Sequence, residues 1–210
     1  MNRLLRVARW LLIAFGLGVF ALFAAHLALR PNPELAASEQ YHVLSAYIVP
    51  NLTGESHDLG GRNGLVVIDG RTTFSEPLVH SNKFKQYVSL LASTGHAKAR
   101  IRQLRRSLVC EFWMANLLDV TLERRFQLPA RYELATEREM KLYPSEAFFA
   151  RFQSGYGALT FSRVAFNREL TEAFFYTEHL CGLCGEGQFV YMRKTGDKWV
   201  VADTASTWIS

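Results

Sequence analysis

The sequence predicts an α+β protein in which an N-terminal transmembrane helix precedes one domain, with helices covering one face of an antiparallel sheet. Three observations lead to this prediction. A run without Lys, Arg, Asp or Glu extends from Trp10 to Leu29. Apolar residues recur at helical spacing between 34 and 152. From Tyr156 to Ser210, short runs rich in Phe, Val, Tyr and Trp alternate with turn residues, which is typical of an antiparallel meander of four strands.

The run from Trp10 to Leu29 has the length of a membrane span. Its 20 residues rise about 30 Å as a helix, which is the thickness of the hydrocarbon core of a bilayer. A cleavable signal peptide is the alternative interpretation, because arginines precede the run. We favour an uncleaved anchor, since signal-peptide apolar regions are about 7–15 residues long and no small-x-small cleavage site follows this run.

Charge orients this anchor and sets the domain boundaries. Arg3, Arg6 and Arg9 precede the run, so the positive-inside rule keeps the N-terminus in the cytoplasm. We therefore expect a cytoplasmic arm and anchor in residues 1–30 and an extracytoplasmic α+β domain in residues 31–210. The predicted location is the bacterial cytoplasmic (inner) membrane, crossed once, with the lipid bilayer as the partner of the anchor.

One face of the anchor carries small residues at helical spacing, namely Ala14, Gly18, Ala21 and Ala25. Small side chains let a second helix approach closely, so this face is a candidate for self-association. The alternative is that alanine and glycine are simply frequent in membrane helices.

The distribution of charge argues against nucleic acid as a partner. The formal net charge is +5, but Arg3, Arg6, Arg9 and Arg30 flank the apolar run. Without these four, 20 Lys and Arg residues stand against 19 Asp and Glu residues. A nearly neutral domain lacks the basic surface that binds nucleic acid. No P-loop or similar cofactor motif is present, and we expect no cofactor.

Apolar spacing, caps and helix breakers predict the elements between the anchor and the meander. Helices are expected at 34–49 (closed by Pro50), 82–93, 97–118 and 145–152, and a capping box at 136–139 opens a further short helix. Leu65–Ile68 has the continuous apolar run of a buried strand. The segment 120–134 is expected to be mostly extended.

Turn residues predict where the meander reverses, at 167–169, 181–187 and 195–197. Trp199 and Trp208 lie on its last strands, and we expect at least one of them to be fully buried. Aromatic residues in such strands belong first to the core. The second interpretation is that Trp199, Trp208 and Tyr191 line an apolar pocket for a ligand.

Cys181-Gly-Leu-Cys184 is the motif with the clearest chemical potential, and three interpretations stay open. A redox centre needs a helix after the first cysteine to lower the thiol pKa, whereas a strand pattern follows here. A zinc site needs four ligands, and His179 and Cys110 are the candidates to join the pair. We favour a structural loop whose two cysteines are free or bridged. Cys110 is then expected to be an unpaired, buried thiol.

Acid–base chemistry is not predicted at a defined place. The side chains that could form an acid–base set are those of Asp69, Glu76, His80 and His96. Any chain of this length holds similar residues, and their spacing does not bring them together. No catalytic residue is assigned.

Several stretches resemble a family of small, uncharacterised bacterial proteins that are exported or membrane-anchored. These stretches are 39–46, 65–72, 159–167 (LTFSRVAFN), 173–176, the CGLCGEG loop at 181–187, and Lys198-Trp199 through Trp208-Ile209-Ser210. The resemblance covers most of the chain from about Ser38 onward. It implies a domain boundary, and it implies no activity, cofactor or site residue.

Two function classes stay open. We favour a membrane-anchored extracytoplasmic module without catalysis, which binds a peptide or apolar ligand or associates with the cell envelope. The alternative is a thiol–disulfide or metal-dependent enzyme centred on Cys181 and Cys184. The first class is favoured because these cysteines lack the following helix and the partner residues that such chemistry requires.

Overall fold

The computed structural model describes residues 30–53, 64–72, 94–95, 97–153, 157–181 and 184–209. The elements in chain order are α2 (Pro33–Thr53), β1 (Leu65–Asp69), α4 (Arg106–Ala115), β2 (Arg131–Ala135), α5 (Glu137–Met140), α6 (Glu146–Arg151), β3 (Ala158–Phe161), β4 (Ala165–Phe166), β5 (Glu172–Cys181), β6 (Cys184–Thr195) and β7 (Lys198–Ile209). The predicted anchor, its small-residue face and the helix expected at 82–93 lie outside the described residues. Within the described part of the chain, no helix is both long and apolar enough to span a membrane.

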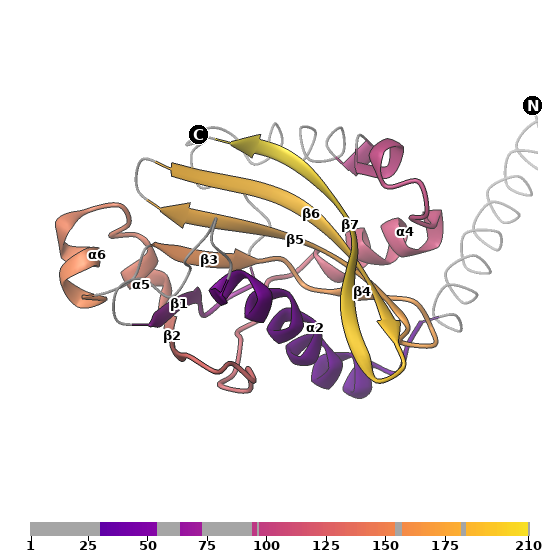
Figure 1. Cartoon of the computed structure of the whole chain (residues 1–210), viewed down its shortest axis with the longest axis horizontal. Coiled ribbons are helices and arrows are strands. Elements are labelled where there is room, and N and C mark those ends of the chain that lie inside the picture. The colour runs from indigo at the N-terminus through magenta and orange to yellow at the C-terminus, as the bar shows by residue number, and fades with distance from the viewer. Residues whose placement is uncertain are drawn as a thin grey trace, which may run out of the picture.

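The described strands form one mixed seven-stranded sheet with the order β2-β1-β3-β5-β6-β7, and β4 pairs with β5 (Figure 1). From β3 onward all pairs are antiparallel, as the predicted meander requires. Its last turn holds Gly196 at a φ of 59°, a conformation that glycine adopts easily. β1, however, is parallel to both β2 and β3. The prediction of a purely antiparallel sheet is therefore wrong.

Long connections account for the parallel strands. A parallel pair needs a crossover of a dozen residues or more, whereas an antiparallel pair follows a tight hairpin. α4 lies in the connection between β1 and β2, and α5 and α6 lie in the connection between β2 and β3. Leu65–Asp69 is buried along its whole length, as the continuous apolar run predicts and as parallel strands usually are.

Helices cover both faces of the sheet rather than the one face that was predicted. α2 packs on the first face, where the rings of Tyr47 and Phe175 meet edge to face at 5.4 Å. α4 packs on the second face, where Phe112 meets Phe174 at 5.2 Å. Successive side chains of a strand point to opposite faces, so the two neighbouring phenylalanines of β5 belong to two separate cores. The physical reason is that β5 carries a large aromatic side chain on each face, so both faces must be shielded from water.

The end of α2 differs from the prediction. The helix continues through Pro50 to Thr53 instead of closing before the proline. The side-chain amide of Asn51 donates to the carbonyl oxygen of Tyr47 at 2.7 Å, in the turn where proline has no amide hydrogen to donate. Burial of the helix against the sheet thus outweighs the local signal to stop.

The remaining helices agree with the sequence in part. The expected helix at 97–118 is interrupted, and α4 begins only at Arg106. The capping box is confirmed, because Thr136 accepts a hydrogen bond from the amide of Glu139 while the Glu139 carboxylate accepts one from the amide of Thr136. The helix expected at 145–152 is confirmed as α6, which buries Phe148 beneath β1.

Burial of both faces of the sheet predicts how substitutions in each core change the free energy of unfolding. Phe112→Ala and Phe175→Ala each remove a fully buried ring from a different core, so each should lower the free energy of unfolding by about 3–5 kcal/mol. Chemical denaturation of the intact chain in detergent measures both. The exposed Leu142→Ala is the control and should change stability by about 0.5 kcal/mol or less. A tolerated Phe112→Ala would contradict the second core.

Candidate functional site

A groove of about 620 Å³ lies between α2 and the hairpin of β6 and β7. In Figure 1 this hairpin reaches the N-terminal part of α2. The residues that line the groove come from both elements and from the segment before β2: Glu39, His42, Ser45, Ala46, Val49, Pro50, Gln127, Lys194, Asp197, Lys198 and Trp199. Its volume is within the range of about 300–1,000 Å³ that small-molecule sites have.

Glu39 joins the two walls of this groove. One carboxylate oxygen accepts hydrogen bonds from Lys194 Nζ and from the indole Nε1 of Trp199, each at 2.7 Å. The other oxygen lies 3.2 Å from Nδ1 of His42. Burial opposes ionisation of Glu39, but these hydrogen bonds outweigh it, so its pKa lies below the usual value. The ionised carboxylate therefore fastens α2 to the hairpin.

Trp199 forms an aromatic wall of the groove. Its side chain packs against Phe166 with ring centroids 6.0 Å apart, and only 7 % of the residue is exposed. Trp199 is thus buried, although neither C-terminal tryptophan is fully buried as predicted. Ala46 and Val49 of α2 add an apolar surface, while Lys198 at the turn brings a positive charge. The groove can hold a molecule that is apolar in part and charged in part.

The three aromatic residues predicted to face a ligand lie in different places. Trp199 lies at the groove on the α2 face. Tyr191 is completely buried on the opposite face, in the core that α4 covers. Trp208 is partly buried and donates a hydrogen bond from Nε1 to the hydroxyl of Tyr176 at 3.1 Å. The structure therefore brings Trp199, but neither of the other two, to the groove.

Trp208 explains the glycines that follow the second cysteine. A Cβ atom added at Gly187 would collide with both the indole of Trp208 and the hydroxyl of Tyr176, and one at Gly185 would come within 2.9 Å of the indole ring. Glycine is needed at both positions because the indole lies directly on this part of β6. Sequence reasoning assigned the glycines to turn flexibility and missed this packing.

The cysteine motif forms the end of the β5–β6 hairpin. Cys181 and Cys184 face each other in the strand register, and Cys181 is disulfide-bonded. The side chain of Cys184 lies outside the described residues, so the pairing of these two cysteines stays a prediction. β6 follows directly, and no helix in the described part of the hairpin is placed to lower a thiol pKa.

The other candidate metal ligands lie on separate elements. His179 is on β5 opposite Glu186, and Cys110 is on α4. Cys110 is free, as expected, but its thiol is exposed, so the prediction of a buried residue is wrong. The helical spacing was correct, but Leu108 and Phe112 face the sheet and turn Cys110 away from it. Among the described residues, no group of three His, Cys, Asp or Glu side chains could hold a metal ion.

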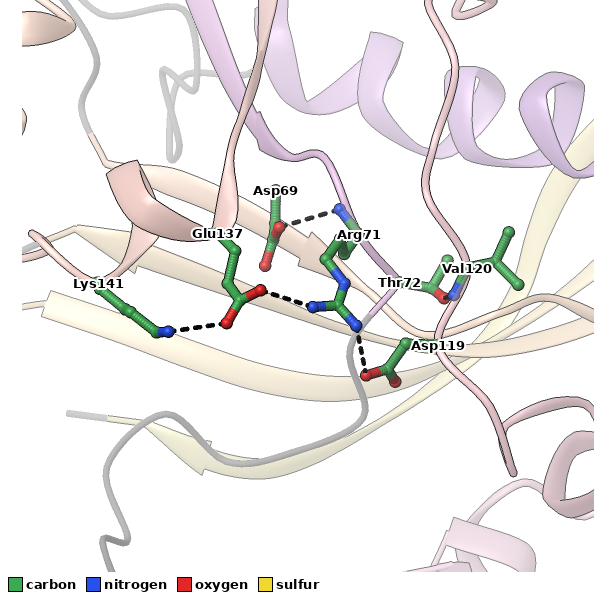
Figure 2. A network of polar contacts seen from close by, with 7 residues as sticks. All are labelled: Asp69, Arg71, Thr72, Asp119, Val120, Glu137 and Lys141. Atoms are coloured by element: carbon green, nitrogen blue, oxygen red, sulfur yellow. Dashed lines mark hydrogen bonds and ion pairs between the residues drawn. The ribbon is translucent and has the colours of Figure 1, made fainter.

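A second candidate site lies at the carboxyl end of β1 (Figure 2). Asp69 is 6 % exposed, and one of its oxygens accepts a hydrogen bond from the amide of Arg71 at 3.0 Å. The guanidinium of Arg71 donates to Glu137 at 2.8 Å and to Asp119 at 3.4 Å. Asp69 is thus close to a charged network without an ion-pair partner of its own in the described structure.

Burial raises the pKa of Asp69 to about 6, and the Arg71 amide and guanidinium only partly oppose this. A buried carboxyl group that titrates near neutrality is a candidate for proton transfer or for binding. Ligand sites often lie at the carboxyl ends of parallel strands, which is where Asp69 lies. Of the four acid–base residues considered from sequence, Glu76, His80 and His96 lie outside the described residues.

Comparisons with known proteins do not assign a family. No family model matches the chain, and no curated protein or solved structure matches it either. The resemblance of the C-terminal motif to exported bacterial proteins stays a prediction. The candidate sites are therefore judged on their own geometry.

The raised pKa of Asp69 predicts a specific pH dependence. Between the usual value of 3.8 and about 6, the folded protein retains a proton that the unfolded chain has released, so this group lowers the free energy of unfolding as pH rises. Asp69→Asn keeps the acceptor for the Arg71 amide and removes the ionisation. It should match the wild type near pH 4 and exceed its stability at pH 7.5, by up to about 3 kcal/mol.

Denaturant titrations at both pH values measure this difference, and the exposed Asp203→Asn serves as the control. An Asp69→Asn variant that gains nothing at pH 7.5 would show that the carboxyl group is better solvated or better paired than its described neighbours indicate.

Proposed function

We propose that this chain is a membrane-anchored extracytoplasmic module that binds a ligand without catalysis, and that the ligand is a short peptide held between α2 and the β6–β7 hairpin. The observation that carries the proposal is the groove itself. It combines the aromatic wall of Trp199 with the apolar surface of Ala46 and Val49. An apolar concave surface with a few fixed polar groups is the usual form of a binding site.

The polar groups at the groove favour a peptide over a purely apolar molecule. Lys198 and Asp197 bring opposite charges to the same turn, and Gln127 adds an amide on the other side. A short peptide carries both terminal charges and amide groups, and an apolar side chain can lie against Ala46 and Val49. Glu39 already accepts hydrogen bonds from Lys194 and Trp199, so its carboxylate fixes the shape of the groove. The side chains at the rim of the groove are left to contact the ligand.

The alternative enzyme has less support. Cys181 ends β5 and Cys184 begins β6, without the following helix that activates a redox thiol. The hairpin also places the motif at the end of the sheet, whereas the groove lies at the opposite hairpin, that of β6 and β7. Binding at the groove and a structural bridge at the other end are compatible with each other.

The topology can be tested with fusions to the intact chain. The arginines before the apolar run predict that residues 31–210 are outside the cytoplasm. In a Gram-negative host, a C-terminal alkaline phosphatase fusion should be active and membrane-bound, and a C-terminal green fluorescent protein fusion should be dark. The reverse pattern would overturn the orientation, and an active but soluble, shortened product would favour the signal-peptide interpretation.

Peptide binding can be tested by filling the groove. Intact chain in lipid nanodiscs should retain a subset of a random hexapeptide library, identified by mass spectrometry. Ala46→Trp should abolish this enrichment because a large ring would occupy the groove. Ala150→Trp places the same ring on an exposed position of α6 and should retain it. Equal enrichment by both variants, with unchanged melting, would rule out the groove as the site.

A further inference from the structure

A small cavity is lined by the start of the described chain, the first half of α2, the second half of α4 and the segment 163–166. Its volume of about 190 Å³ is below the range of about 300–1,000 Å³ that holds whole small molecules, so it admits only a small chemical group. Most of its lining is apolar. The charged and polar side chains are those of Arg30, Gln40, Glu111 and Arg163, and we call this space the arginine cavity.

Hydrogen bonds fix Arg163 at the arginine cavity and leave most of its guanidinium available. Its backbone amide donates to the side-chain oxygen of Asn116 at 2.7 Å, and its carbonyl oxygen accepts from the Asn116 amide at 3.1 Å. One guanidinium nitrogen donates to the carbonyl oxygen of Ala115 at 3.0 Å. Among the described residues no carboxylate forms an ion pair with Arg163, so its other N–H groups have no acceptor there.

The charges at the arginine cavity do not cancel. Arg30 Nε pairs with a carboxylate oxygen of Glu111 at 3.2 Å. Burial and the charge of Arg30 lower the pKa of Arg163, and Glu111 only opposes them. Two guanidinium groups against one carboxylate leave one positive charge in excess. A bound anion would relieve this repulsion, because charge-assisted hydrogen bonds to arginine are strong where little water is present.

Gln40 brings a neutral hydrogen-bond donor to the same cavity. It lies on the stripe of α2 that also carries Pro33, Ala36 and Ala37, and all four residues line the cavity. Gln40 is only 9 % exposed, and its side-chain amide has no hydrogen-bond partner among the described residues. A buried amide is costly unless a ligand or water satisfies it. The cavity thus combines an available guanidinium with an available amide.

We propose that the arginine cavity binds a phosphate group, with Arg163 and Gln40 donating hydrogen bonds to its oxygen atoms. The small volume and the single excess positive charge fit the monoanionic phosphate of a diester, such as that of a phospholipid headgroup. Arg30 directly follows the apolar run that ends at Leu29, which favours the headgroup as the source. That source depends on the anchor proposed above, whereas the cavity does not, and free inorganic phosphate is the other source.

Native mass spectrometry of the intact, delipidated chain in dodecyl maltoside micelles tests this proposal, because this detergent carries no phosphate. Dioleoylphosphatidylglycerol is compared with dioleoylglycerol, which has the same tails without phosphate. The wild type should retain the phospholipid roughly tenfold more than the diacylglycerol, and Arg163→Gln and Gln40→Leu should each lose most of this preference. Arg138→Gln changes an exposed arginine of α5 and should retain it.

Melting of the same samples with inorganic phosphate or acetate separates the possible sources. Stabilisation by phosphate but not acetate, lost in Gln40→Leu, would support the site with a free ligand even if no lipid is retained and the anchor fails its fusion test. Retention of the phospholipid without any effect of inorganic phosphate would assign the lipid headgroup. Equal retention of both lipids together with no effect of phosphate would overturn the proposal. So would equal stabilisation by acetate, or a folded Gln40→Leu variant that binds like the wild type.

Discussion

Burial of both faces of β5 and β6 is the constraint on which the rest of the structure depends. Phe174, Phe175, Phe189 and Val190 are completely buried, so each face of these strands needs a helix over it. α2 supplies one cover and α4 the other. Because α2 must lie along the sheet to do this, its Glu39 reaches the β6–β7 hairpin and the groove forms beside it. The candidate binding site is thus a consequence of how the core is closed.

The surroundings of Glu39 and Asp69 shift the pKa values of these two carboxyl groups in opposite directions. Glu39 receives hydrogen bonds from Lys194, Trp199 and His42, which keep it ionised. Asp69 receives one from a backbone amide, and burial raises its pKa toward neutrality. The first carboxylate therefore works as a structural clamp. The carboxyl group of Asp69 lowers the stability of the fold when it ionises. Buried carboxyl groups of this kind often belong to functional sites.

α2 runs from the start of the described chain to the groove. Asn32 caps its start, and Ala46 lies about 20 Å farther along the same helix. The ion pair of Arg30 with Glu111 fixes this start to α4.

Patterns among neighbouring residues in the sequence determined the meander with its turns, the buried run of β1 and the capping box at Thr136. These features depend on neighbouring residues, so they can be read from spacing alone. Tertiary structure decided the parallel pairing of β1, the second covered face, the glycines beneath Trp208 and the exposure of Cys110. It also decided the clamp at Glu39 and the burial of Asp69. Each of these depends on residues far apart in the chain, such as Glu39 and Trp199, whose meeting no local pattern encodes.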